Sequence, residues 1–433
     1  MPFFQSEVET LDPAAIGHLQ RQKLARLLEE IRPSNAFYQQ KLAGIQFDPL
    51  TDDLTKLPFT TREELQRDQE AHPPFGTNLT YELTRYNRYH QTSGTTGVPM
   101  RWLDTPESWE WFKRCWCIID RAAGVVPTDR FVFPFSFGPF IGFWGAFEAA
   151  ASLGNLCLPA GGMSTSARLR YLLDNGATVV CCTPTYALRM AETAQEEGLD
   201  LASSAVRLLI VAGEPGGSLP AVRSRIESDW GARVIDHVGM TEMGAYGFEC
   251  LEARGGMHVI ETEFIAEIAN PLTGEPVPDG TRGELVLTNL GRWGSPLIRY
   301  RTGDVVDISR KRCACGRSFA RLEGGILGRA DDMLIVRGNN VFPTAVEAIL
   351  RGFAEIAEFR LVVSTTGGMT ELTIEVERGS DPVRSLSDVA FAEKITEAVR
   401  ERLSFRAEVK CVPPGSLPRF EMKSHRVVRS KKP

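Results

Sequence analysis

The chain of 433 residues is too long for one compact hydrophobic core, so its length predicts two or three domains. Hydrophobic residues make up 43% of it and charged residues 24%, which is typical of a soluble globular protein. The formal net charge of −6 gives no reason to expect a nucleic-acid partner. The opening residues, MPFFQSEVETLDP, are acidic where a signal peptide would be basic and apolar, which favours a cytoplasmic location.

The first predicted element is a helix over residues 14–32, where apolar side chains recur at helical spacing. A run of small hydroxyl and glycine residues follows in RYHQTSGTTGVPM, residues 88–100, and is typical of a loop that wraps backbone amides around an anion. A Walker phosphate loop needs a lysine directly after its second glycine, but Gly97 is followed by Val98. The sequence therefore disfavours a Walker-type NTPase.

The longest apolar stretch runs from Phe131 to Gly162. Pro134, Pro139 and Glu148 interrupt it, whereas a membrane-spanning helix needs roughly 20 mostly uninterrupted apolar residues. We therefore expect no membrane partner. Its many aromatic residues leave two interpretations open: an ordinary hydrophobic core, or an aromatic-lined ligand pocket whose ring faces are exposed at the Gly and Pro bends.

Between about residues 120 and 240, short apolar runs alternate with amphipathic helical patterns. The runs that resemble buried strands are RFVFPF, NLCLPA, ATVVCC, VRLLIVAG and ARVIDHVGM. This alternation predicts a parallel sheet with helical crossovers. After residue 258 the strand patterns EFIAEIAN and RGELVLTNL, joined by the turn PLTGEPVPDG, predict antiparallel pairing instead.

The last segment begins near Gly328 and combines strand patterns with a long helix expected from about Ser385 to Leu403. The whole pattern predicts an α/β fold. A large N-terminal α/β domain, residues 1–328, would hold the parallel sheet and a strand-rich subdomain, and a small α+β C-terminal domain would occupy residues 329–433.

The nine cysteines are an odd number in a long chain without a predicted export signal, which does not indicate a disulfide framework. Cys181 and Cys182 lie in the apolar run ATVVCC, so we expect buried thiols that act as small hydrophobic groups. Cys313 and Cys315 differ, because the segment RCACG is polar and places them close together.

A metal site is predicted when two upstream residues are added to this pair. Cys250 and His258 lie in ECLEARGGMHV, at the start of the strand-rich region. Three thiolates and one imidazole form the closed tetrahedral donor set that is typical of structural zinc. We therefore predict that Cys250, His258, Cys313 and Cys315 bind zinc, with unliganded surface thiols as the alternative.

Five motifs occur in a fixed order across most of the chain: TSGTTGVP at 92–99, GMTE at 239–242, RYRTGDV at 299–305, GRADDMLIVRG at 328–338 and LPRFEMK at 417–423. Together they resemble those of the adenylate-forming superfamily of acyl-CoA and aryl-CoA ligases. Within it, the short chain and the segments VVCCTPTYAL, AGEP and RGNNVFP are most similar to the phenylacetate–CoA ligase branch.

The resemblance implies a two-step reaction. ATP would activate an aromatic or arylalkyl carboxylic acid, with phenylacetate as the default, to an acyl-adenylate with release of pyrophosphate. Coenzyme A would then accept the acyl group, giving a thioester and AMP. The partners would be small molecules, and a homodimer is one open arrangement.

Two alternatives stay open beside this reaction. One is a stand-alone adenylating enzyme that loads a carrier protein or an amine. The other is a nucleotide-binding protein with lost catalysis, which the joint presence of Glu242, Asp304 and Lys423 disfavours.

By resemblance, the loop at 92–99 would embrace the β- and γ-phosphates of ATP. Its hydroxyls and closely approaching backbone would come from Ser93, Gly94, Thr95, Thr96 and Gly97. Thr241 would contact the α-phosphate and Glu242 would hold Mg²⁺, a hard cation suited to carboxylate and phosphate oxygens. The family often has an aromatic residue just before the glycine of GMTE, where this chain has Val238, preceded by His237.

The nucleoside would be held by two further motifs. Gly213, Glu214 and Pro215 resemble the segment that lies along adenine, and Asp236 is a further adenine-side candidate. Asp304 would accept hydrogen bonds from both ribose hydroxyls, a geometry that suits an ionised carboxylate.

The stretch Gly328–Asp332 resembles the hinge about which a mobile C-terminal domain rotates between the two half-reactions. Arg329 would approach the ribose or a phosphate, and Asp331 matches the pivot. Lys423 matches the adenylation lysine, whose ammonium would bridge the substrate carboxylate and the α-phosphate. The basic residues after it, beginning with Arg426, are expected in a solvated tail, with contact to CoA phosphates as the alternative.

Overall fold

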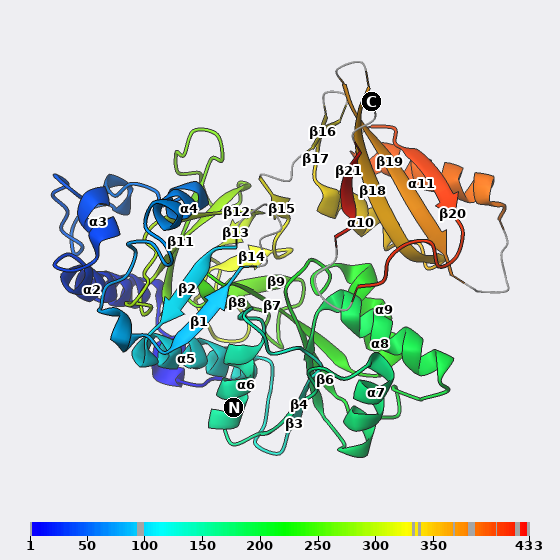
Figure 1. Cartoon of the computed structure of the whole chain (residues 1–433), viewed down its shortest axis with the longest axis horizontal. Helices are drawn as coiled ribbons and strands as arrows, with labels where there is room; N and C mark the ends of the chain where they lie inside the picture. The colour runs from blue at the N-terminus through cyan, green and yellow to red at the C-terminus, as the bar shows by residue number, and fades with distance from the viewer. Residues whose placement is uncertain are drawn as a thin grey trace.

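The computed structural model describes residues 2–92, 99–330, 334–336, 339–366, 369–379, 386–403, 405–420 and 425–430. Figure 1 shows a large body, coloured blue to yellow-green, and a smaller body, coloured yellow to red, beside one end of it. The expected α/β class with a separate C-terminal domain is confirmed by this architecture. Among the described residues, no helix combines the length and the apolar character needed to cross a membrane.

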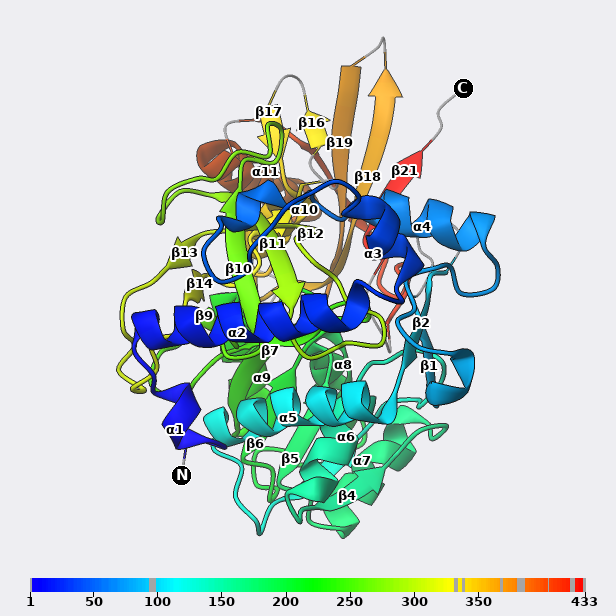
Figure 2. The same cartoon turned by 90° about the vertical axis from the view of Figure 1, so that its left-hand side faces the viewer.

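The N-terminal helix expected from the sequence is α2 (Pro13–Ile31). The Asp12 side chain caps it by accepting a hydrogen bond from the Ala15 amide at 2.8 Å. The helix crosses β10 (Phe264–Ala269) near the start of that strand (Figure 2). Gln20 donates there to the Phe264 backbone oxygen at 2.8 Å. The other short helices of this region are α1 (Ser6–Glu9), α3 (Ala36–Lys41), η1 (Leu54–Lys56), α4 (Arg62–Ala71) and η2 (Leu83–Arg85).

The largest sheet of the described residues has nine strands in the order β13-β14-β9-β8-β7-β6-β5-β3-β4. Its parallel part consists of β3 (Arg130–Phe133), β4 (Leu156–Pro159), β5 (Val179–Cys182), β6 (Leu208–Val211) and β7 (Arg233–Met240). Its antiparallel part consists of β8 (Gly244–Phe248), β9 (Gly256–Val259), β13 (Ile308–Ser309) and β14 (Arg321–Glu323). The predicted parallel sheet is therefore present, and it continues into an antiparallel half.

Helices cover both faces of the parallel part (Figure 1). They are α5 (Pro106–Ala122) and α6 (Trp144–Ser152) on one face, and α7 (Thr165–Asp174), α8 (Pro184–Glu196) and α9 (Pro220–Trp230) on the other. Because side chains alternate along a strand, Phe131 and Cys181 pack in the first core and Val132 and Cys182 in the second. The expectation that both of these thiols are buried is confirmed.

Two smaller sheets complete the large body. The first has the order β10-β11-β12-β15 and is antiparallel, as expected: β10 (Phe264–Ala269), β11 (Gly283–Asn289), β12 (Tyr300–Val306) and β15 (Gly328–Arg329). The second is the ribbon of β1 (Arg88–Gln91) and β2 (Arg101–Asp104).

The C-terminal elements surround a hydrophobic core of their own. They are β16 (Leu334–Val336), β17 (Asn339–Val341), α10 (Pro343–Leu350), β18 (Ile356–Thr366), β19 (Met369–Arg378), α11 (Asp388–Leu403), β20 (Glu408–Val412) and β21 (Val427–Ser430). Four of these strands form a sheet in the order β20-β19-β18-β21, on which α10 and α11 pack (Figure 1).

Candidate active site

A cavity of about 400 Å³ opens at the carboxyl ends of the parallel strands. Six aromatic side chains of the described residues line it: Phe112, Trp116, Phe135, Phe140, Phe143 and Tyr186. Phe131 and Phe133 lie instead in the hydrophobic core. Both interpretations of the aromatic stretch are therefore correct for different parts of it. Because the sequence led us to expect a carboxylic acid here, we call this space the acid cavity.

A second cavity, of about 320 Å³, lies between the two bodies and is called here the nucleotide cavity. It gathers the predicted nucleoside-binding residues from separate parts of the chain: Gly213, Glu214, Pro215, Asp236, Asp304 and Arg329. The C-terminal body contributes Glu347 of α10 and Phe359 of β18 to the opposite wall.

The two cavities share a wall. Gly213, His237, Gly239 and Met240 border both of them. Three of these residues belong to β7, at the edge of the sheet where open α/β proteins bind their ligands. A molecule in one cavity therefore lies next to a molecule in the other.

Asp304 is held in position by two neighbours that the sequence analysis did not pair with it. The hydroxyl of Tyr246 donates to one carboxylate oxygen at 3.2 Å. Arg329 donates to the other at 3.3 Å, because its strand β15 pairs with β12 directly opposite Asp304. The carboxylate thus faces the nucleotide cavity in a fixed orientation.

The turn after β7 is fixed by Arg292, which the sequence analysis missed. Its guanidinium is completely buried and donates to the backbone oxygens of Thr241 and Glu242 at 2.8 and 2.7 Å. Asp104 balances this charge at 2.7 Å. The Tyr300 hydroxyl donates to Glu242 Oε1 at 2.9 Å, so this carboxylate is also oriented.

Asp236 is a carboxyl of the nucleotide cavity whose pKa is raised. Burial raises its pKa to about 7, and the nearby Glu249 carboxylate acts in the same direction. The Ser218 hydroxyl opposes this shift by donating to Oδ2 at 2.5 Å. A carboxyl in this environment holds its proton far more readily than one in water.

The four residues of the predicted metal site converge. The ligand atoms of Cys250, His258, Cys313 and Cys315 all lie within 4.8 Å of one another. The sulfurs of Cys250 and Cys313 are 3.8 Å apart, and Cys315 Sγ lies 3.6 Å from His258 Nε2. His258 Nδ1 lies 3.2 Å from the backbone oxygen of Phe319, which turns Nε2 toward the thiols. None of the four lines either cavity.

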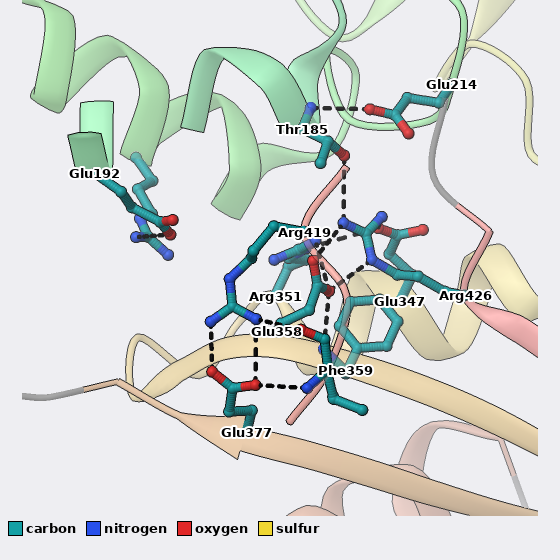
Figure 3. Close-up of polar contacts among 12 residues, drawn as sticks. Thr185, Glu192, Glu214, Glu347, Arg351, Glu358, Phe359, Glu377, Arg419 and Arg426 are labelled. Carbon is teal, nitrogen blue, oxygen red and sulfur yellow. Dashed lines mark hydrogen bonds and ion pairs between the residues drawn. The ribbon is translucent and has the colours of Figure 1, made fainter. Parts of the chain in front are cut away.

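Arg426 corrects one expectation, because it is 6% exposed rather than part of a solvated tail. It donates to Glu358 at 2.7 Å and to Glu347 at 3.2 Å, and both carboxylates belong to the C-terminal body (Figure 3). It also donates to the hydroxyl of Thr185 in α8 at 3.3 Å, across the junction of the two bodies. The Thr185 amide in turn donates to Glu214 at 2.9 Å. The wall of the nucleotide cavity is thus linked to the C-terminal segment.

Comparison with known proteins shows the family to which a chain with these two cavities belongs. A family model described as AMP-binding enzyme matches residues 89–291, and one described as AMP-binding enzyme C-terminal domain matches residues 338–431. The phenylacetate-coenzyme A ligase of Thermus thermophilus is 32% identical over 96% of this chain and 97% of its own length. That of Escherichia coli is 30% identical over 97% and 96%. The chain belongs to the adenylate-forming AMP-binding enzymes.

A solved structure of 2-hydroxyisobutyryl-CoA ligase in the postadenylation state, in complex with 2-HIB-AMP, is similar to this ligase with a TM-score of 0.93. It is 28% identical and covers 99% of this chain and 93% of its own. In the thioesterification state the same enzyme gives a TM-score of 0.74. The arrangement of the two bodies is therefore more similar to that structure in the postadenylation state than to the one in the thioesterification state.

This adenylate-forming ligase activates a carboxylic acid with ATP and then makes a thioester with coenzyme A. The expected reaction class is thereby confirmed, and transfer to CoA replaces the alternative acceptors. Several predicted residues lie outside the described ranges: Ser93, Gly94, Thr95, Thr96, Gly97, Asp331 and Lys423. The described residues beside them lie at the site, since Gln91 and His425 line the acid cavity.

Proposed function

We propose that the ligase activates an aromatic or arylalkyl carboxylic acid, with phenylacetate as the first candidate. The observation that supports this choice is the ring of six aromatic side chains around a cavity of about 400 Å³. Aromatic walls favour an aromatic ligand through offset and edge-to-face contacts. The curated relatives named phenylacetate-coenzyme A ligases agree with this choice.

A short branched hydroxy acid is the second candidate. It is favoured by the close structural similarity to the 2-hydroxyisobutyryl-CoA ligase. A small aliphatic acid would leave much of the acid cavity unfilled, and cavities that a ligand does not fill lose contacts. We therefore rank the aromatic acid first.

The nucleotide would bind with its adenine along Gly213, Glu214 and Pro215, beside Asp236. The oriented carboxylate of Asp304 would accept hydrogen bonds from the ribose hydroxyls, with Arg329 beside it. The hydroxyls and backbone amides of Ser93, Gly94, Thr95, Thr96 and Gly97 would hold the departing phosphates.

The charge that develops during adenylation would be stabilised by two side chains. The Lys423 ammonium would bridge the substrate carboxylate and the α-phosphate. The Thr241 hydroxyl would donate to an α-phosphate oxygen, because its backbone is fixed by Arg292. Both groups stabilise negative charge that is larger in the transition state than in the separate reactants.

Glu242 has the properties of a Mg²⁺ ligand. It is buried, one oxygen accepts from Tyr300, and the other has no hydrogen-bond partner among the described residues. A carboxylate oxygen that has no hydrogen-bond partner can coordinate a hard divalent cation. When bound there, Mg²⁺ would neutralise part of the phosphate charge.

Cys250, His258, Cys313 and Cys315 would hold one structural zinc ion. The four ligand atoms lie within 4.8 Å of one another, so they could supply all four positions of a tetrahedral zinc site and leave none open for substrate. The hydrogen bond from His258 Nδ1 to the Phe319 backbone oxygen fits a neutral imidazole that offers Nε2 to a metal.

We also propose the division into residues 1–328 and 329–433, with Asp331 as the pivot. Arg329 pairs with Asp304 of β12, and the Ala330 amide donates to the Gly303 backbone oxygen. The first two residues of the second part therefore still contact the large body, and the pivot at Asp331 follows them directly. A cytoplasmic location and a homodimer remain expectations, to be checked by cell fractionation and by light scattering.

The test is a panel of carboxylic acids assayed for pyrophosphate release with and without CoA. We expect the highest kcat/KM with arylacetic acids, and continuous turnover only when CoA is present. A higher kcat/KM for 2-hydroxyisobutyrate than for every aromatic acid would contradict the aromatic assignment and favour the second candidate.

A further inference from the structure

His237 is a polar residue at the point where the two cavities meet. It is 5% exposed and lies on β7, where side chains alternate between the two faces. His237 and Gly239 line the acid cavity, whereas Asp236 and Val238 line only the nucleotide cavity. The imidazole packs against the indole of Trp116 with 4.2 Å between the ring centroids. The ring therefore forms part of the wall that an acid would touch.

The hydrogen bonding of His237 decides which ring nitrogen can accept. Nδ1 lies 2.8 Å from the backbone oxygen of Gly247. Because a carbonyl oxygen only accepts, Nδ1 must carry the proton. Burial lowers the pKa of His237 to about 4, so the ring is neutral at physiological pH and Nε2 keeps its lone pair. Among the described residues, Nε2 has no hydrogen-bond donor.

Nε2 is not among the fully buried polar atoms that lack a partner, so it is open to the acid cavity, where water or a ligand can donate to it. When an acid displaces that water, the acceptor is left unpaired unless the acid supplies a donor. We propose that His237 Nε2 determines specificity by accepting a hydrogen bond from a hydroxyl or amino group of the substrate acid. This proposal rests on the acid cavity of the proposed function and narrows the substrate class. The preferred acids then carry a donor that the corresponding unsubstituted acids lack.

The place of the donor on the substrate follows from the position of His237. The reacting carboxylate must reach the α-phosphate, and it does so where the cavities join. His237 borders both cavities, so it faces the part of the acid next to the carboxylate. The donor therefore belongs on the α-carbon or at the ortho position of an aryl ring, not at the para position. A neutral acceptor would repel the carboxylate oxygens themselves, which excludes Nε2 as their binding group.

The experiment measures kcat/KM for acids that differ only in the donor. The aromatic set is phenylacetate, mandelate, 2-hydroxyphenylacetate and 4-hydroxyphenylacetate, and the aliphatic pair is isobutyrate and 2-hydroxyisobutyrate. We expect the α- or ortho-hydroxylated acid to exceed its unsubstituted counterpart by about tenfold, because a site built to pair with a hydroxyl rejects an analogue without it. The para-hydroxylated acid should show no such gain.

Two variants separate the hydrogen bond from the shape of the wall. In His237→Leu the ratio of hydroxylated to unsubstituted acid should fall to about one, since the acceptor is lost. In His237→Gln an amide oxygen can replace Nε2, so part of the ratio should return. Melting temperatures of both variants report whether the fold is retained.

The outcomes distinguish this proposal from the proposed function. Equal kcat/KM for hydroxylated and unsubstituted acids in the unmodified ligase would overturn the role of His237, while turnover of phenylacetate would leave the aromatic assignment intact. A preference that persists in His237→Leu would also overturn it. If only the aliphatic pair is turned over, the aromatic assignment fails, and the same ratio measured on that pair still decides the role of His237.

Discussion

Arg292 illustrates how a single buried side chain positions the groups that we propose contact the substrates. Its guanidinium connects Asp104 of β2 with the backbone oxygens of Thr241 and Glu242. A guanidinium offers its donors in a rigid plane, so it can hold both partners at once, and a lysine could not. The turn that carries Thr241 is therefore held in place before any ligand binds.

Lys423 is the residue whose removal should separate the two half-reactions. Lys423→Ala should lower the rate of acyl-adenylate formation by roughly 100-fold, the scale of losing one preorganised electrostatic group. Thioester formation from preformed acyl-adenylate should be retained, because the role proposed for the lysine is confined to adenylation. Rapid-quench assays of each half-reaction provide the measurement. An equal loss in both would show that the lysine has been assigned wrongly.

Asp236 should make stability depend on pH. Burial raises its pKa from 3.8 to about 7, so the folded protein keeps a proton that the unfolded chain has already lost. The free energy of unfolding then falls as pH rises between these two values. Asp236→Asn cannot titrate, so its melting temperature relative to the unmodified protein should increase from about pH 5 to about pH 8. The exposed substitution Asp174→Asn is the control and should show no such trend. A constant difference across this range would contradict the assignment.

The metal cluster shows how neighbouring strands bring distant residues together. Cys250 lies between β8 and β9, and His258 lies on β9. Cys313 and Cys315 lie between β13 and β14. Because β14 pairs with β9, the two pairs of ligands meet at one edge of the largest sheet. A metal there would cross-link two loops that no disulfide joins.

Purified protein should contain about one zinc ion per chain, since three thiolates and one imidazole form a complete set of four ligands that favours this metal. His258→Ala and Cys315→Ser should reduce the metal content and the melting temperature, because the binding free energy of a structural site contributes to folding. Cys411→Ser, a half-buried thiol on β20, is the matched control and should change neither. Elemental analysis after purification without a chelator or metal-affinity tag is the measurement. A metal-free protein of unchanged stability would rule out the zinc site.

The elements that could be predicted from the sequence are those with strong local patterns. β5 and β6 are buried on both faces and read as continuous apolar runs, and the Asp12 cap precedes α2. The order of the nine strands could not be predicted, because pairings such as β14 with β9 join residues far apart in the chain. The same reason explains why the prediction that Arg426 lies in a solvated tail was wrong. That prediction rested on the basic residues that follow Arg426 in the sequence. Its partner Glu358 lies far away in sequence, and charge patterns do not reveal such pairs.

At the scale of the whole molecule, the junction of the two bodies depends on polar contacts. Arg426 joins carboxylates of the C-terminal body to Thr185 of the large body (Figure 3). This arrangement resembles the postadenylation state more closely than the thioesterification state, with TM-scores of 0.93 and 0.74. The bond between Arg426 and Thr185 therefore stabilises the arrangement of the two bodies described here, and a rotation of the C-terminal body at the proposed pivot would break it.

Thr185→Val keeps the shape of the side chain and removes the hydroxyl that Arg426 contacts. We expect the rate of acyl-adenylate formation to fall by about tenfold, because hydrogen bonds to charged groups are among the stronger ones. Thioester formation from preformed acyl-adenylate should change little. Thr193→Val on the same helix is the matched control, since its hydroxyl donates to the Arg189 backbone oxygen of that helix and to no other group among the described residues. Equal losses for the two variants would show a general effect on α8 rather than on the junction.

The wall shared by the two cavities has a consequence for the lifetime of the intermediate. On the proposed assignment of the two cavities, acid and nucleotide bind as two separate molecules, and adenylation joins them into one ligand that is held at two places. When the acyl end detaches, the nucleotide end keeps it at a high effective concentration beside its cavity, and the acyl end rebinds before the whole molecule escapes. The acyl-adenylate therefore dissociates far more slowly than either reactant. The acyl-adenylate is a mixed anhydride, which water hydrolyses. Slow dissociation would therefore keep it bound until the thiol of CoA reacts with it.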